Sequence, residues 1–438
     1  MIRFEWLALL IIAPFLMFPT PVRSLALLGV PFLWTARKIS RARFIDRTPL
    51  DWPISLLLLM ALVSLYATYS IEESLPKIAG VILGVAVFYA LVHHTRRIRP
   101  WLLGLSLFIC AGGGVAALAL VGSIRLDKFP PLTALSARLP SFNLNLAGAE
   151  KGFHPNEVAG ALLWVAPPAL AAAYAAWIGR RKLSESLGSL QASLLIAVTG
   201  LLAAFICGVM VLTQSRGGLL AFAVTLVLTG VLAAAAAWSS RSRAWRLGML
   251  AVGVVLLGLG PIMLARSQRP AQLMFGSTAV GEGALSGDSL AGRVEVWSRA
   301  IYGIQDFAFT GMGMNTFRRV VPVLYPLFSI GPEVDIGHAH NEFLQAALDL
   351  GIPGLIAFLA VDFGAFAMLA VSWRQRAKLP LSEPVTRALI LGLGGGLLAH
   401  LLYGLTDAVA LGAKPGVLWW WLLGLIASMY RLQLTANS

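Results

Sequence analysis

Cysteine and charged residues are scarce in this chain of 438 residues. It has only 2 cysteines and 12% charged residues, whereas about a quarter of the residues in a soluble domain are charged. Cys110 and Cys207 both lie inside apolar runs. We therefore expect two small buried hydrophobic side chains and exclude a disulfide framework or a cysteine metal cluster. Because 58% of the residues are hydrophobic, the composition excludes a soluble protein and predicts an all-α polytopic membrane protein.

Several catalytic motifs are also absent from the sequence. It contains no GxxxxGK[ST] phosphate loop, no HExxH, no DxD and no serine nucleophile elbow, which argues against an ATP-driven pump and a zinc protease. Glu333 and Asp335 have an ExD-like spacing, but two acids alone are weak evidence for a divalent ion. We predict no metal and no cofactor.

The chain has 20 acidic residues and 34 Lys and Arg residues, which gives a net charge of +14. If the N-terminus is cytoplasmic, 20 of the Lys and Arg residues fall in inner segments and 4 in short outer connections, while 10 lie in two long outer loops. The positive-inside rule then places both termini in the cytoplasm. No basic run carries the interleaved aromatic residues of a nucleic-acid platform, so we expect membrane lipids and not nucleic acid as the partner of this charge.

The apolar runs predict about twelve transmembrane helices, because a helix needs about 20 residues to cross the hydrocarbon layer. Residues 1–122 contain about five, 156–265 contain the sixth to ninth, and 341–438 contain the last three. The predicted spans are 4–19, 22–36, 53–70, 75–94, 100–122, 156–178, 190–213, 217–238, 245–265, 341–373, 386–406 and 414–432.

Two predicted outer loops, 123–155 and 266–340, are too long to be simple connections. In the larger loop, apolar residues recur at helical spacing over 292–307, which predicts an amphipathic helix. The Gly- and Ser-rich stretch 276–292 before it is typical of a lid or a linker. We therefore expect a large periplasmic loop that contains short helices.

The densest polar cluster lies where this loop enters the tenth predicted span. His338, His340 and Asn341 are close together there, in a chain with only 6 histidines. Histidine exchanges a proton near neutral pH, which suits catalysis, and Asn341 is well placed to cap the following helix. The alternative is a capping turn in which the histidines make local hydrogen bonds only.

Two arginines are candidate ligands for phosphate. Arg216 lies on a very short outer connection before Gly217 and Gly218, at the positive end of the next predicted helix. Arg293 opens the predicted loop helix. Planar guanidinium groups bind phosphate oxygens bidentately. The alternatives are a snorkelling Arg216 at the interface and a solvated Arg293.

Weaker signals come from two outer segments. In GFHPNEVAG, Asn156 is expected to cap the sixth span, with His154 beside it. In GMGMNTFRR, Asn315 lies near Arg318 in a loop turn. A lone GxG without a preceding strand is not evidence for nucleotide binding.

The ordered set of motifs resembles the O-antigen ligase/polymerase superfamily. The set comprises an outer TQSRGG turn, a long outer loop with GR followed by Trp, a G-x-N-T-F turn, and an H-x-H-N-x-x-L motif followed by Gly351. The resemblance spans residues 150–355. It implies a multi-pass enzyme of the Gram-negative inner membrane that works on the periplasmic side and takes a glycan from undecaprenyl pyrophosphate. The ligase transfers that glycan to a lipid A core sugar.

The resemblance assigns roles that agree with the chemistry of the residues. His338 would be the general base, and Arg216 and Arg293 would bind the pyrophosphate. His340, Asn341 and Asn156 would orient His338 or the sugars, and His154, Asn315 and Arg318 are further substrate-binding candidates. Direct attack by the acceptor hydroxyl would invert the anomeric centre, because no well-placed carboxylate suggests a covalent intermediate.

Three alternatives remain from the sequence. A polymerase or a protein O-oligosaccharyltransferase would share these motifs, and the ligase is favoured by the motif pattern and the single large loop near the C-terminal third. A lipid-linked glycan transporter would place ionisable groups in the middle of the membrane, where Asp362 and Asp407 are the main candidates.

Overall fold

The computed structural model describes residues 2–17, 20, 22–41, 45–122, 153–237, 290–330 and 336–435. In this described part of the chain the secondary structure is helical, and no strand occurs. The predicted span 245–265, most of the loop 123–155, the stretch 266–289, and Glu333 and Asp335 lie outside the described residues.

The helices run in the order predicted from the apolar segments. The N-terminal block, up to residue 122, contains helices α1 to α5 and a short 3₁₀ segment, η1. The bounds are α1 Ile2–Met17, η1 Arg23–Leu28, α2 Gly29–Arg41, α3 Asp51–Ala67, α4 Ile71–His94 and α5 Ile98–Gly122. The second block contains α7 Pro155–Ile178, α8 Arg180–Leu187, α9 Ser189–Leu212 and α10 Arg216–Ala237.

The C-terminal part begins with two helices of the predicted large loop and then returns to long apolar helices. The predicted amphipathic helix is confirmed as α13, Leu290–Asp306, and α14 covers Phe317–Leu324. The others are α15 Glu342–Arg374, η2 Arg376–Lys378, α16 Glu383–Gly404, η3 Lys414–Gly416 and α17 Val417–Thr435. α15 bends at Gly351, whose φ of 72° lies in the left-handed region.

Eight helices of the described residues are long and apolar enough to span a membrane, and they coincide with eight of the twelve predicted spans. The predicted first and third spans form the shorter apolar helices Glu5–Met17 and Asp51–Ala67. The predicted span 22–36 forms η1 and α2 and is not among these apolar helices, because α2 continues into the basic residues Arg37, Lys38 and Arg41. The protein is thus a helical polytopic membrane protein.

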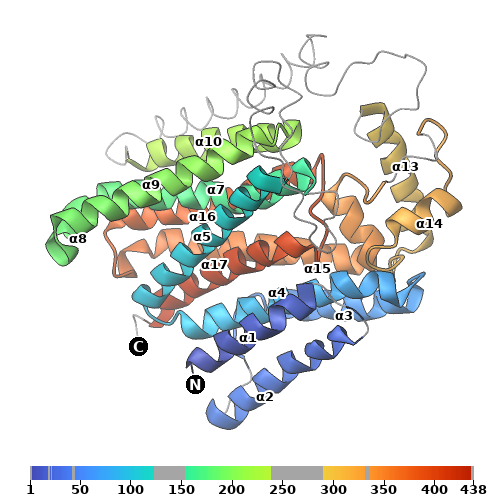
Figure 1. Ribbon diagram of the computed structural model, residues 1–438, viewed down its shortest axis with the longest axis horizontal. Coiled ribbons are helices and arrows are strands. Elements are labelled where there is room, and N and C mark those ends of the chain that lie inside the picture. Colours follow the sequence, from blue (N-terminus) through green and yellow to red (C-terminus); the bar gives the residue numbers. More distant parts are fainter. Residues whose placement is uncertain are drawn as a thin grey trace.

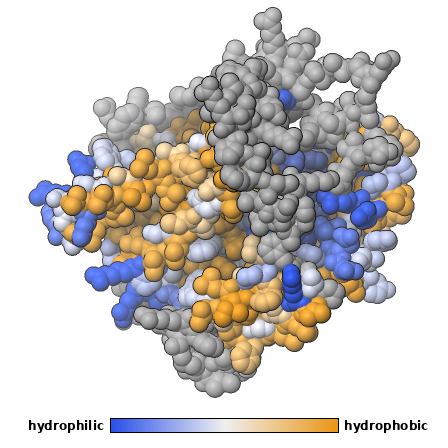
Figure 2. Space-filling view, viewed as in Figure 1, coloured by the Kyte–Doolittle hydropathy of each residue, from blue (hydrophilic) through white to orange (hydrophobic). Residues whose placement is uncertain are grey.

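The long helices lie side by side in one bundle (Figure 1). α1 begins and α17 ends at the end that carries α8, while α13 and α14 cover the opposite end. In the space-filling view, hydrophobic side chains cover the middle of the helices and hydrophilic ones gather toward both ends (Figure 2). Leu190 and Leu201 on α9 are 72% and 71% exposed, as expected where lipid covers a helix face.

Small residues let the central helices approach closely. Gly392 and Gly396 on α16 face α7, and a Cβ at these positions would come within 2.2 Å of Ala171 and 2.6 Å of the Trp164 carbonyl oxygen. Close backbone approach through glycine is the usual basis of helix packing in lipid. The result is a rigid central pair that carries α16 and its C-terminal loop to the end covered by α13.

The two cysteines do not have the predicted burial. Cys110 on α5 is exposed and Cys207 on α9 is partly buried. Both helices present one face outside the bundle, so an apolar run did not distinguish a lipid-facing side chain from a buried one.

Candidate active site

The two histidines of the GHAHN segment form a tight turn directly before α15. The backbone N–H of His340 donates to Nδ1 of His338 at 3.1 Å, and the two imidazole rings lie 4.5 Å apart between centroids. His340 has a φ of 47°, a left-handed conformation that is costly for a residue with a Cβ. The predicted cap is confirmed, because Asn341 Oδ1 accepts the N–H groups of Phe343 and Leu344.

Asp407, in the loop after α16, is the residue that joins the predicted site together. One carboxylate oxygen lies 3.3 Å from Nδ1 of His340 and 3.9 Å from Nε2 of His338. The other lies 3.8 Å from a guanidinium nitrogen of Arg293. Asp407 is only 4% exposed, whereas the His338 side chain is 30% exposed. A buried anion is therefore surrounded by three basic side chains, of which His338 is the most open to the outside. We call these four residues the Asp407 cluster.

The electrostatic environment fixes the charges of this cluster. Burial raises the pKa of Asp407, but the contact with His340 and the charges of His338 and Arg293 outweigh burial and lower the pKa to about 2. The pKa of His338 is lowered to about 3, chiefly by burial and next by His340, although Asp407 opposes the shift. At neutral pH the cluster thus contains an ionised Asp407 and a neutral His338.

The hydrogen bonds of His338 also assign its tautomer. Because Nδ1 accepts the His340 N–H, the single proton of the neutral ring resides on Nε2, the nitrogen that faces Asp407. In a His–Asp pair the carboxylate holds the N–H side of the ring, and the other nitrogen is the basic one. The lone pair of the neutral His338 ring is accordingly on Nδ1, where the His340 N–H occupies it in this structure.

Arg293 reaches this cluster from α13. Val296 and Ala300 of the same helix are fully buried against α15 and the loop before it, and Trp297 Nε1 donates to the carbonyl oxygen of His340 at 3.3 Å. α13 is therefore fastened to the histidine turn directly, and Arg293, one turn earlier on the helix, points toward Asp407.

Arg216 lies at the first position of α10, beside the same loop. Ser215 Oγ accepts the N–H of Gly218 and caps the helix. A Cβ at Gly217 would lie 2.5 Å from Oγ1 of Thr406, so the start of α10 is packed against the neighbour of Asp407. The side chain of Arg216 is exposed, and no hydrogen bond or ion pair joins it to another residue that the structure describes.

The remaining predicted residues differ in their proximity to the cluster. The charge of His154 acts on His338. Asn156 is not the cap of α7: His154 occupies the N-cap position, because Pro155 has no N–H and fits the first helical position. The carbonyl oxygen of Asn156 accepts the Tyr403 hydroxyl at 2.6 Å, which ties α7 to the end of α16.

Arg318 and Asn315 belong to the segment that follows α13. The Arg318 guanidinium packs on Gly337, next to His338, since a Cβ there would come within 2.9 Å of it. Asn315 has a φ of 66°, and its side-chain amide donates to the Glu73 carbonyl oxygen at 3.0 Å. The side chain of Asn315 therefore ties this segment to α4.

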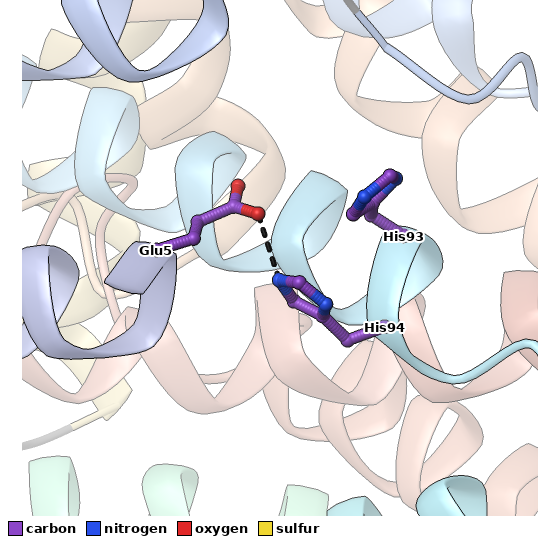
Figure 3. Close-up of side chains that lie close together, drawn as sticks. All are labelled: Glu5, His93 and His94. Atoms are coloured by element: carbon purple, nitrogen blue, oxygen red, sulfur yellow. Dashed lines mark hydrogen bonds and ion pairs between the residues drawn. The ribbon is translucent and has the colours of Figure 1, made fainter. Parts of the chain in front are cut away.

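Two groups of described residues have the spacing of metal ligands. In each, one potential ligand atom per residue lies within 4.8 Å of the others. The first group, His338, His340 and Asp407, coincides with the candidate site, where the Arg293 cation already faces Asp407. The second comprises Glu5, His93 and His94 at the opposite end of the bundle, where Glu5 on α1 and His94 on α4 form a 2.7 Å hydrogen bond (Figure 3).

Two residues near the site were not among the sequence candidates. From the sequence alone, Asp407, near the outer end of its span, was considered only as a candidate ionisable group of a transporter, although an acid at that place is itself a signal for a site. Lys77 on α4 is partly buried, and its charge acts on His338, Glu342 and Asp349. Only the fold brings either residue to the histidine turn.

Comparison with known proteins gives one match. Residues 201–359 match the family model described as O-antigen ligase, and no curated protein matches the chain. The matched segment includes Arg216, Arg293 and the histidine turn, together with the first half of α15. The motif resemblance is thus confirmed for residues 201–359, which are similar to the O-antigen ligase family.

Proposed function

We propose that this protein is a glycosyltransferase that moves an O-antigen glycan from undecaprenyl pyrophosphate to a sugar hydroxyl of the lipid A core. The observation that carries the proposal is the Asp407 cluster, in which His338, His340 and Arg293 surround one buried carboxylate at a polar end of the bundle. The site belongs to the periplasmic face of the Gram-negative inner membrane, and both termini are cytoplasmic.

His338 is the general base of the proposed reaction. Asp407 holds the Nε2–H side of the ring, and the acceptor hydroxyl takes the place of the His340 N–H at Nδ1. As the hydroxyl oxygen attacks the anomeric carbon, its proton passes to Nδ1, and the bond from carbon to the pyrophosphate oxygen breaks. A positioned base of this kind contributes about 10²–10⁴-fold in rate. Asp407 stabilises the imidazolium that results.

Arg216 and Arg293 hold the leaving pyrophosphate. Negative charge grows on its oxygen atoms during transfer, and fixed cations in a low-dielectric site stabilise such charge without reorganising. Arg216 is supported in this role by its place at the N-terminus of α10, where the helix dipole favours anions. Arg293 is supported by its position over Asp407, and Lys77 adds a third positive charge.

The stereochemical course proposed is inversion by direct attack. Asp407 is a carboxylate in the site, contrary to the sequence-based premise, and a carboxylate can form a covalent glycosyl intermediate. Its two oxygen atoms, however, face His338, His340 and Arg293, and it is 4% exposed. We therefore assign it to orientation and charge stabilisation. The donor already carries a good leaving group, and Arg293 supplies the positive charge near Asp407, so the proposed reaction proceeds without a metal or a cofactor.

The transporter alternative receives less support. Asp362, its other candidate residue, is buried on α15, and one carboxylate oxygen accepts Trp419 Nε1 at 3.0 Å. This contact ties α15 to α17 within the bundle core. The ionisable groups that the fold collects at the histidine turn lie at one end, as an enzyme at the membrane surface requires.

The acceptor decides between the enzyme alternatives. The purified full-length chain is supplied with labelled undecaprenyl-pyrophosphate glycan and one of three acceptors: lipid A core, a second lipid-linked glycan, or an acceptor protein. The ligase assignment predicts labelled lipid A core. Product on the second lipid-linked glycan alone would identify a polymerase, and product on protein alone an O-oligosaccharyltransferase.

A further inference from the structure

A buried glutamine connects the histidine turn to the interior of α15. Gln345 is 2% exposed. Its Oε1 accepts the backbone N–H of Ala339 at 2.8 Å, and its Nε2 donates to Oδ1 of Asp349 at 2.8 Å. Ala339 is the residue between His338 and His340. One side chain thus holds the backbone of the turn from which both imidazoles project.

The orientation of the Gln345 amide is fixed by its two partners. A backbone N–H can only donate, so Oε1 of Gln345 must face Ala339, and Nε2 is left to donate to Oδ1 of Asp349. Asp349, one turn further along α15, is also 2% exposed, and the adjoining Leu348 carbonyl oxygen accepts the N–H of Met312. The contacts of Gln345 and Asp349 therefore adjoin the buried segment around Met312, which follows α13.

The turn needs such a support. Ala339 is fully buried, and a buried N–H without an acceptor costs about 1–3 kcal/mol. His340 holds a left-handed conformation, which persists only where the surroundings enforce it. If Gln345 loses its acceptor oxygen, we expect the turn to relax and the His338 ring to leave its position beside Asp407.

We propose that Gln345, oriented by Asp349, is a positioning residue for catalysis: it fixes the His338–Ala339–His340 turn and thereby holds the His338 ring beside Asp407. This inference rests on the proposed function. It adds a residue that does not touch substrate and acts through the backbone of the two histidines.

The chain contains a matched control for this residue. Gln433 on α17 is fully buried, and its Nε2 donates to the Ser372 carbonyl oxygen near the end of α15 at 3.1 Å. It has the same side chain and makes one buried hydrogen bond where Gln345 makes two, and it lies near the end of the bundle opposite to α13. Q345L and Q433L thus make similar changes in packing and polarity, and only the former touches the histidine turn.

A swapped pair tests the hydrogen bonds themselves. Q345E keeps an acceptor for Ala339 but places a carboxylate against Asp349. In Q345E/D349N the amide moves to position 349, where it can donate to the new glutamate, and the direction of the contact is reversed without a change in net charge. If Gln345 only filled space, the double variant would not be expected to recover the activity lost in Q345E.

The experiment measures glycan transfer from undecaprenyl-pyrophosphate glycan to lipid A core by the purified full-length variants, together with their Tm. We expect Q345L to lower kcat about 10-fold to 100-fold, as a misplaced catalytic group does, with KM for both substrates nearly unchanged. Q433L should keep kcat within about twofold at a similar loss of Tm, and Q345E/D349N should recover most of the activity lost in Q345E.

Two results would overturn the inference: equal kcat in Q345L and Q433L, or no recovery in the double variant. H338A, measured in parallel, separates this failure from that of the proposed function. If H338A is inactive while Q345L is fully active, only the positioning role of Gln345 fails. If H338A transfers glycan at the wild-type rate, the proposed base fails, and the positioning role fails with it.

Discussion

The two ends of the bundle each bury one aspartate among histidine and arginine side chains, but they pack it differently. Asp46 lies 2.6 Å from His93 Nδ1, 2.8 Å from Arg96 and 3.2 Å from Arg431. Asp407 lies 3.3 Å from His340, 3.8 Å from Arg293 and 3.9 Å from His338. Both aspartates are 4% exposed. The same components therefore form a closed ion-pair network at one end and a looser one at the other.

This difference agrees with our proposal that the Asp46 cluster is structural and the Asp407 cluster is reactive. The pKa of Asp46 is well below its ordinary value, because hydrogen bonds from His93 and Arg96 and the charges of the arginines outweigh its burial. These contacts join the segment before α3 to α4 and α17. Around Asp407 the contacts are longer, and His338 is 30% exposed where His93 is 6%. The longer contacts and the exposure of His338 agree with the active site that we propose.

The largest contrast is expected from the two aspartates. D407N removes the charge that orients and stabilises His338, and we expect the transfer rate to fall by about 10²-fold, with a lowered Tm because Asp407 is also a buried, paired charge. D46N breaks the shorter hydrogen bonds of the Asp46 network and should lower Tm while the rate per folded molecule is retained. Transfer assays and thermal unfolding of both proteins check this. Equal effects on rate and Tm in the two variants would remove the distinction between the clusters.

The next largest effect is expected at the arginines. R293K and R216K keep the positive charge but lose the planar fork, so the KM for the undecaprenyl-pyrophosphate donor should rise about tenfold, a loss of about 1.4 kcal/mol. R431K, at the Asp46 cluster, is the control and should leave this KM unchanged. Kinetics with varied donor concentration distinguish the variants, and unchanged KM in both R293K and R216K would contradict the assignment of a phosphate clamp.

A smaller effect is expected from the cap of α15. Asn341 caps this helix and its Nδ2 donates to the Leu405 carbonyl oxygen at 3.1 Å, which ties the histidine turn to the Asp407 loop. N341D keeps the capping acceptor but loses the donor, so we expect a few-fold fall in kcat and a loss of stability of about 1 kcal/mol. S70A removes the cap of α4 and serves as control, with a similar stability loss of about 1 kcal/mol and unchanged kcat. A larger kcat loss in S70A would count against the tie.

The smallest effect is a shift in pH dependence. The pKa of His338 is lowered to about 3 by burial and by His340, so the free enzyme keeps an unprotonated base as pH falls through 6.5, where an ordinary histidine becomes charged. The acid limb of kcat/KM should therefore lie below pH 5. H340N removes one source of the lowered pKa and should move that limb to higher pH. An acid limb at pH 6.5 in the wild type, unmoved in H340N, would contradict this environment.

The sequence predicted those features that depend on local pattern. Apolar length located eight long helices, helical spacing located α13, and the position of Asn341 before an apolar run predicted its cap. The predicted cap at Asn156 was wrong by two positions, since both His154 and Asn156 flank Pro155 and only the backbone shows where the helix begins. Cys110 was misjudged because lipid and protein interiors accept the same apolar residues.

The assembly of the site could be predicted only in part. Arg293 and His338 were recognised by residue type and motif, but Asp407 lies 69 positions beyond His338 in the sequence. It reaches the histidine turn because α15 and α16 return the chain to the same end of the bundle. The hydrophobic periodicity of the sequence does not indicate that contact. Nor does it distinguish Gln345 from the other buried positions of α15.

The most direct test of the account is the transfer of labelled glycan by the wild type and by H338A, with H93A as the matched histidine at the other cluster. Purified proteins receive undecaprenyl-pyrophosphate glycan and lipid A core, and the initial rate is expressed per folded molecule. The account predicts a loss of about 10²–10⁴-fold in H338A and a rate near that of the wild type in H93A. Wild-type transfer by folded H338A would contradict the account.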